Sequence, residues 1–225
     1  MKILIAVCAA LSVAAAVSSA ATIVGTVHAE GKAGADQAAA GGKYESRKLK
    51  FVERVNYAEL RDFVVSVEQT AYFKFEPPAK PLKEAQKDGT FTPHVLPVLV
   101  GSVVEWPNND DIFHNVFSIS DPKPFDLDLY NAPEIKRVTF EKPGRVDVFC
   151  SIHTRMHCII LVLENPYFAV TDAKGRYTIT NVPPGKYKLK AWHERLPSQV
   201  QEITVSEHGE ATVDFTLGIT NLPQY

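Results

Sequence analysis

The chain has 225 residues, enough for one or two domains with buried cores. Its net charge is only −2 and it has no basic run, so we expect no nucleic-acid partner. Residues 1–20 hold a lysine, a long apolar run and small residues before Ala21, which predicts a signal peptide cleaved after Ala20. An uncleaved membrane anchor is the alternative. With cleavage, we expect a periplasmic or otherwise exported protein without a membrane span.

Strand patterns dominate the next part of the chain. Residues 21–28 and 61–69 alternate between apolar and polar side chains, which predicts two strands. The Ala/Gly-rich residues 29–43 predict a flexible loop, and residues 48–59 fit a strand followed by a short helix. Residues 73–89 contain three prolines and several lysines, which indicates a solvated connector.

From Phe91 onward, short strands and turn signals recur about every ten residues, which is typical of β-sandwiches. Turns are predicted at Gly101, at Pro143-Gly144, at Lys174-Gly175 and at residues 183–185. Residues 158–164 are apolar on both faces, so we expect a central strand there.

The stretch VFCSIHTRMHC at residues 148–158 contains two cysteines, two histidines and a methionine. The strand period of two places Cys150 on the same inward face as Val146 and Val148. His153 and Met156 follow on a short loop, so both can fold back toward the sulfur. A thiolate, imidazoles and a weak thioether are the ligands of a blue-copper electron-transfer site.

Such a site needs a second imidazole from elsewhere in the chain. His114 is the best candidate, because it follows a strand and a polar turn at the same end of the predicted sandwich. A disulfide between Cys150 and Cys158 is one alternative, which an exported protein permits. Zinc is another, although zinc rarely accepts a thioether. Copper is favoured because a disulfide gives no reason for His153 and Met156 at these spacings.

The segment FTPHVLPVLVGSVVEWPNNDDIFHNVF followed by FCSIHTRM resembles the cupredoxins, the family of plastocyanin, pseudoazurin and amicyanin. The Cys-x2-His-x2-Met spacing is similar to that of amicyanin. The resemblance covers about residues 91–164. It implies one copper ion in a type 1 site, bound by His114, Cys150, His153 and axial Met156.

The same resemblance implies that Asn115 braces the ligand loop through Ser151. The segment also departs from the family pattern, because His157 follows the axial methionine directly and is a competing ligand. His94, which begins a strand in the same domain, is a further weaker candidate. His193 and His208 carry no ligand spacing.

A second resemblance lies downstream. Residues 169–193 are similar to the carboxypeptidase regulatory-like, or transthyretin-like, sandwich, which is itself similar to carbohydrate-binding-like folds. Strands that usually begin this family occur here upstream of the cupredoxin segment. We therefore expect an all-β chain, with a Greek-key cupredoxin sandwich inserted in, or packed beside, a prealbumin-like β-sandwich. The expected domains are the signal peptide (1–20), the first part of the carboxypeptidase regulatory-like sandwich (21–85), the cupredoxin domain (86–164) and the remaining part of the carboxypeptidase regulatory-like sandwich (165–225).

Together these features predict an exported type 1 copper protein that transfers electrons by Cu(I)/Cu(II) cycling to an unidentified redox partner protein. The two-part design resembles methylamine-utilisation-type periplasmic proteins. We expect no enzyme, because the sequence has no Ser-His-Asp pattern and no paired-carboxylate motif. The alternative is a non-redox copper-handling protein, or a glycan- or partner-binding sandwich with a disulfide or structural metal at the Cys-His loop. No aromatic cluster supports a glycan ligand.

Overall fold

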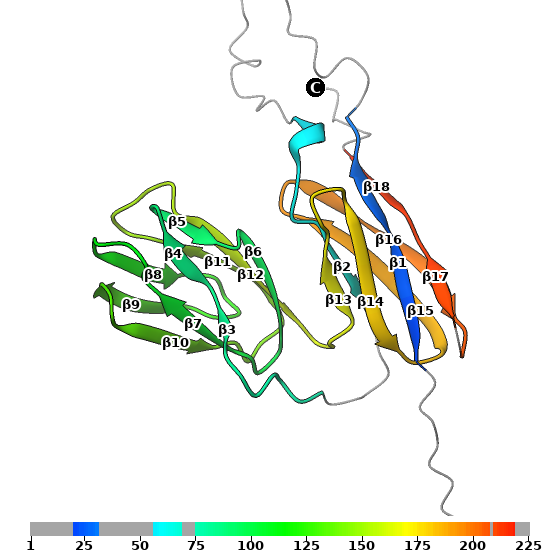
Figure 1. Cartoon of the computed structure of the whole chain (residues 1–225), viewed down its shortest axis with the longest axis horizontal. Coiled ribbons are helices and arrows are strands. Elements are labelled where there is room, and N and C mark those ends of the chain that lie inside the picture. The colour runs from blue at the N-terminus through cyan, green and yellow to red at the C-terminus, as the bar shows by residue number, and fades with distance from the viewer. Residues whose placement is uncertain (1–19, 32–55, 69–74, 208, 219–225) are drawn as a thin grey trace, which may run out of the picture.

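The computed structural model of the chain describes residues 20–31, 56–68, 75–207 and 209–218. Residues 1–19 of the predicted signal peptide, most of the Ala/Gly-rich loop and His208 lie outside these residues. The described residues form two β-sandwiches side by side, with one 3-10 helix, η2 (Tyr57–Glu59) (Figure 1). None of their helices is long and apolar enough to cross a membrane.

The first sandwich, here called the inserted sandwich, contains β3 to β12. One sheet has the strand order β10-β7-β3 and the other the order β6-β12-β11-β8-β9, with β4 and β5 as a separate hairpin. Its core includes the buried Trp106, Phe140, Val146 and Val148. The strands are β3 (Leu82–Lys83), β4 (Ala85–Lys87), β5 (Thr90–Thr92), β6 (Val95–Leu99), β7 (Val103–Pro107), β8 (His114–Ser118), β9 (Phe125–Tyr130), β10 (Ile135–Thr139), β11 (Gly144–Phe149) and β12 (His157–Leu163).

The second sandwich, here called the split sandwich, is built from both ends of the described chain. One sheet has the order β14-β1-β17, with β18 also paired to β1, and the other has the order β13-β2-β15-β16. Its strands are β1 (Ala21–Ala29), β2 (Val64–Val67), β13 (Phe168–Val170), β14 (Arg176–Val182), β15 (Gly185–His193), β16 (Leu196–Val205), β17 (Glu210–Thr212) and β18 (Phe215–Leu217). Because β1 and β2 pair with strands that follow β12, the inserted sandwich interrupts this one, as predicted.

The start of the inserted sandwich differs from the prediction at residue 86. β3 already pairs in parallel with β7, with Leu82 opposite Val104, so this sandwich begins before residue 86. Prolines and lysines dominate this stretch, and a strand of two residues is too short to show an alternating pattern. The Asp88-Gly89 turn then closes the β4–β5 hairpin, with φ angles of 53° and 67° that favour this dipeptide in two-residue hairpin loops.

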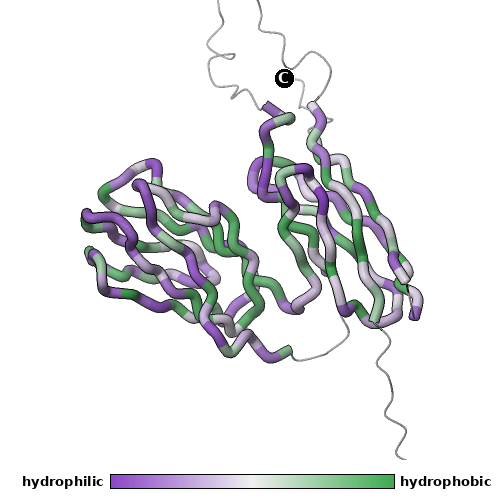
Figure 2. Tube along the Cα trace, viewed as in Figure 1, coloured by the Kyte–Doolittle hydropathy of each residue, from purple (hydrophilic) through white to green (hydrophobic). Residues whose placement is uncertain are grey.

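The apolar pattern of β12 has a specific cause, because its two faces meet different cores. Cys158, Ile160 and Val162 face the core of the inserted sandwich. Ile159 and Leu161 instead belong to a buried cluster that reaches the split sandwich. The other members of that cluster are Val64 and Val95, with Leu163 and Trp192 packed against it. Hydrophobic residues accordingly mark the strands where the two sandwiches meet (Figure 2).

Candidate metal centre

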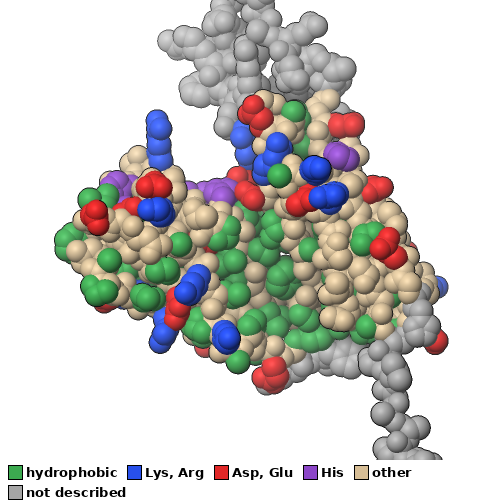
Figure 3. All heavy atoms as spheres, viewed as in Figure 1, with side chains coloured by type: hydrophobic (Ala, Val, Ile, Leu, Met, Phe, Trp, Pro, Cys, Tyr) green, Lys and Arg blue, Asp and Glu red, His purple; other side chains and the backbone are tan. Residues whose placement is uncertain are grey.

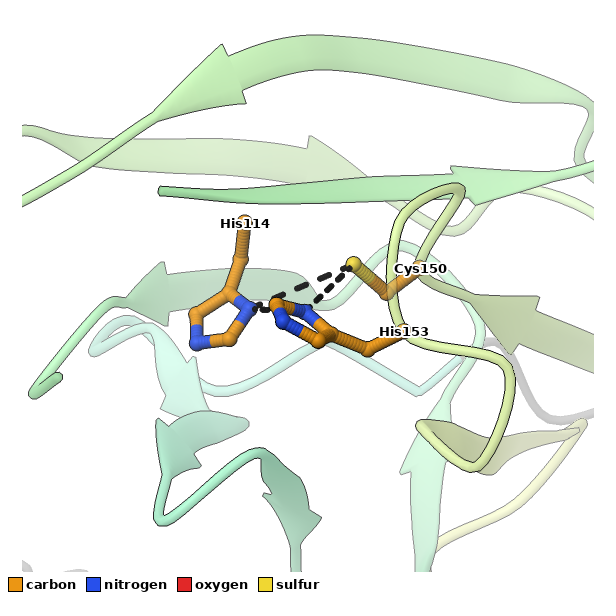
Figure 4. Close-up of side chains that lie close together, drawn as sticks. All are labelled: His114, Cys150 and His153. Atoms are coloured by element: carbon orange, nitrogen blue, oxygen red, sulfur yellow. Dashed lines mark hydrogen bonds between the residues drawn. The ribbon is translucent and has the colours of Figure 1, made fainter. Parts of the chain in front are cut away.

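Three predicted ligands meet at one end of the inserted sandwich. His114 is the first residue of β8, Cys150 directly follows β11, and His153 lies on the loop between β11 and β12. The Cys150 Sγ lies 3.6 Å from His153 Nδ1 and 4.0 Å from His114 Nδ1, and the two Nδ1 atoms are 3.0 Å apart (Figure 4). We call these three residues the thiolate cluster.

The spacing of these donor atoms fits one metal ion. The point equidistant from the three atoms lies about 2.1 Å from each of them, which matches a metal–imidazole bond of about 2.0–2.1 Å and is close to a metal–thiolate bond of about 2.3 Å. Cys150 and His114 are buried, with exposed fractions of 6% and 0%, whereas His153 is half-buried. The cluster therefore lies inside the sandwich and approaches solvent at His153.

The loop that carries His153 is closed by its own backbone. The Cys150 amide donates to the Met156 carbonyl oxygen over 3.3 Å, and the Met156 amide donates to the His153 carbonyl oxygen over 3.0 Å. The Met156 side chain is 1% exposed and belongs to the same buried cluster as Cys150. Burial in this cluster is compatible with the predicted axial thioether.

Asp110 fixes the orientation of His114, a contact that the sequence reasoning missed. The His114 Nε2–H donates to the Asp110 carboxylate over 2.8 Å, which leaves the Nδ1 lone pair directed toward Cys150. The same carboxylate accepts hydrogen bonds from the backbone amides of Asp88 (2.7 Å) and Gly89 (3.0 Å). Desolvation opposes its ionisation, but the hydrogen bonds from Gly89, His114 and Asp88 outweigh that effect and lower the pKa of Asp110.

The predicted disulfide alternative is not formed, because Cys150 and Cys158 are both free thiols. Cys158 lies opposite Val148 across the β11–β12 ladder and is completely buried. Burial raises the pKa of the Cys158 thiol. Cys158 is thus a small residue of the buried core.

The remaining candidates occupy different places. The Asn115 side-chain amide donates to Asp126 over 2.6 Å, and its oxygen has no hydrogen-bond partner among the described residues. The predicted brace from Asn115 to Ser151 is therefore not made by a hydrogen bond. His94 and His157 do not join the thiolate cluster, but form a separate group with Glu194.

Comparison with known proteins identifies part of the chain. Residues 161–218 match the family model of the carboxypeptidase regulatory-like domain. This segment of the chain is similar to the carboxypeptidase regulatory-like domain. The match spans β13 to β18, and β1 and β2 complete the split sandwich from outside it. It confirms the predicted resemblance of the downstream segment.

Several solved structures are similar to the chain. They include a copper-containing nitrite reductase from Thermus scotoductus SA-01, with 31% identity over 40% of this chain and 26% of that one, at a TM-score of 0.37. A purple cupredoxin from Nitrosopumilus maritimus shares 25% identity over 36% of this chain and 98% of that one, at a TM-score of 0.32. Amicyanin from Paracoccus versutus shares 20% identity over 44% of this chain and 96% of that one, at a TM-score of 0.35. The chain thus spans only 26% of the nitrite reductase. No curated protein matched.

Proposed function

We propose that the chain is an exported type 1 copper protein that transfers electrons. The observation that carries this proposal is the convergence of Cys150 Sγ and the Nδ1 atoms of His114 and His153 on one point, with Met156 buried in the same core cluster as Cys150. A thiolate, two imidazoles and a weak thioether are the ligands of a blue-copper site. Copper bound there supplies a Cu(I)/Cu(II) couple that accepts and releases one electron.

The chain holds these ligands in place by bonds of its own. Asp110 fixes the ring of His114, and two backbone hydrogen bonds close the loop between Cys150 and Met156. Donors held in this way need little rearrangement when the charge at the site changes, which suits outer-sphere electron transfer. The proposed ligand set is complete without a substrate, so we propose a carrier rather than an enzyme.

His153 is the route that we propose for the electron, because it is the most exposed member of the thiolate cluster. Apolar side chains flank the ligands in the sequence and are about half exposed: Ile112 and Phe113 precede His114, and Ile152 precedes His153. Exposed apolar groups of this kind suit a transient protein partner. We therefore propose that a redox partner protein docks here, beside the charge of Arg155, and that the encounter takes place in the periplasm or an equivalent exported compartment.

Voltammetry of the copper-loaded chain, residues 21–225, tests this function. The proposal predicts a reversible one-electron wave for the wild type and none for Cys150→Ser. Cys158→Ala, which changes the other buried thiol, is the matched control and keeps the wave. A protein that binds Cu(I) tightly but gives no stable Cu(II) form contradicts the proposal and favours copper handling. A protein that binds zinc but not copper also contradicts the proposal and favours a structural metal site.

A further inference from the structure

A second group of potential metal ligands lies outside the thiolate cluster. His94 directly precedes β6, His157 is the first residue of β12, and Glu194 lies in the turn between β15 and β16. Each side chain offers one donor atom, and these atoms lie within 4.8 Å of one another. The two histidines belong to the inserted sandwich and the carboxylate to the split sandwich. We call this group the rim cluster.

Hydrogen bonds fix which nitrogen of each ring is free to bind a metal. The His157 Nε2–H donates to the Asp147 carboxylate over 2.9 Å, so its Nδ1 carries the lone pair. The His94 Nδ1–H donates to the His157 carbonyl oxygen over 3.3 Å, so its Nε2 carries the lone pair. Histidines that bind metals almost always donate their other N–H to a carboxylate or a backbone carbonyl. Both rings of the rim cluster show this pattern.

The contact between the two sandwiches joins a ring nitrogen to a carboxylate. The His94 Nε2 lies 2.9 Å from a carboxylate oxygen of Glu194. With the His94 proton on Nδ1, the Nε2 lone pair and the carboxylate face each other, and a metal ion can bind both.

The charge balance of the rim cluster favours a divalent ion. Arg145 forms two hydrogen bonds to the Asp147 carboxylate, of 2.6 and 2.9 Å, and balances its charge. Glu194 then supplies the negative charge among the three ligands, and a donor set of two imidazoles and one carboxylate suits zinc and copper. The side chains of His94, His157 and Glu194 are 38%, 26% and 21% exposed, so an ion can enter from solvent.

We propose that His94, His157 and Glu194 bind a divalent transition-metal ion of the zinc or copper type, and that this ion links the two sandwiches. Figure 3 shows histidine and acidic side chains close together on the surface where the two sandwiches meet. His94 is also tied to the apolar cluster between the sandwiches, because its carbonyl oxygen accepts the amide of Ile159 over 2.9 Å. The ion adds a polar link at the edge of that apolar contact.

Counting bound Zn²⁺ by equilibrium dialysis and metal analysis tests this proposal. Wild type, Glu194→Gln and His94→Gln are compared with Glu202→Gln, which removes an exposed carboxylate from β16 of the same hairpin. The proposal predicts that wild type and Glu202→Gln bind one more Zn²⁺ ion per chain than Glu194→Gln and His94→Gln. Asp147→Asn keeps all three ligands and weakens binding at this site about 10- to 100-fold, because His157 loses its oriented partner.

The difference in count between variants does not depend on the function proposed for the thiolate cluster. If that cluster takes no zinc, every protein binds one ion fewer and the difference of one remains. Equal counts and affinities for wild type, Glu194→Gln and His94→Gln overturn the proposal. All the replacements lie on partly or fully exposed side chains, and glutamine or asparagine retains their polarity, so each variant is expected to fold.

Discussion

Glu84 lies between β3 and β4 in the inserted sandwich, and its burial should make the free energy of unfolding depend on pH. Its side chain is completely buried, and neither carboxylate oxygen has a hydrogen-bond partner among the described residues. Desolvation raises its pKa from 4.5 to about 9. The native protein therefore holds this side chain in its neutral form at neutral pH.

The sign and size of the effect follow from the two pKa values. Below pH 4.5 the Glu84 carboxyl is protonated in both the native and the unfolded state, so its ionisation does not change the free energy of unfolding. Between pH 4.5 and about 9 only the unfolded state ionises, so stability falls by about 1.4 kcal/mol per pH unit. At pH 7 the free energy of unfolding is about 3 kcal/mol lower than it is below pH 4.5.

Glu84→Gln removes this loss, because an amide of nearly the same shape does not ionise. We expect the free energy of unfolding of Glu84→Gln, relative to wild type, to increase by about 4 kcal/mol between pH 5 and pH 8. Urea denaturation at four pH values measures this difference, and the other titrating groups cancel because both proteins share them. Glu141→Gln, at a side chain that is 71% exposed, is the matched control. A difference that stays constant over this range means that native Glu84 is ionised, and refutes the reasoning.

Three further predictions concern other contacts. Asp110→Asn should weaken copper binding about 10- to 100-fold, as measured by chelator competition, because His114 loses its charged partner; unchanged affinity would show that the ring is held by other contacts. Leu161→Ala should lower the free energy of unfolding by about 2–5 kcal/mol in urea titrations, because it leaves a cavity between the two sandwiches; a cost below about 1 kcal/mol would mean that the contact is loosely packed. Tyr177→Phe should cost about 1 kcal/mol in the same assay, because it removes a buried 2.7 Å hydrogen bond to a backbone carbonyl; a neutral result would argue against that bond.

Features that depend on local periodicity were predictable from the sequence. The alternation of β11 placed Cys150 on the inward face, and the two apolar faces of β12 indicated a central strand. The turn at Gly101, where φ is 87°, lies between β6 and β7 as predicted. The spacing of His153 from Cys150 likewise indicated that both side chains belong to one loop and one site.

Features that depend on contacts between distant segments were not predictable. Asp110 orients His114, and its carboxylate is held in turn by the Asp88-Gly89 turn. Asp88 and Asp110 are 22 residues apart in the sequence. The partner of Asn115 is Asp126 on the neighbouring strand, which a resemblance in the ligand motif alone did not reveal.

The same holds for the rim cluster. His94 and Glu194 are 100 residues apart in the sequence and meet only because one sandwich is inserted in the other. Spacing along the chain gives no signal for this pair, and the sequence alone predicts His94 only as a weaker ligand in the copper domain. The three-dimensional arrangement instead places it with His157 and Glu194.

The most direct test of the central claim is the visible absorption spectrum of residues 21–225 titrated with Cu(II). Direct coordination of copper by the Cys150 thiolate predicts an intense copper–thiolate band for wild type and for Cys158→Ala, and no such band for Cys150→Ser. A wild-type spectrum without the band, or a band that survives in Cys150→Ser, would contradict the proposed type 1 copper centre.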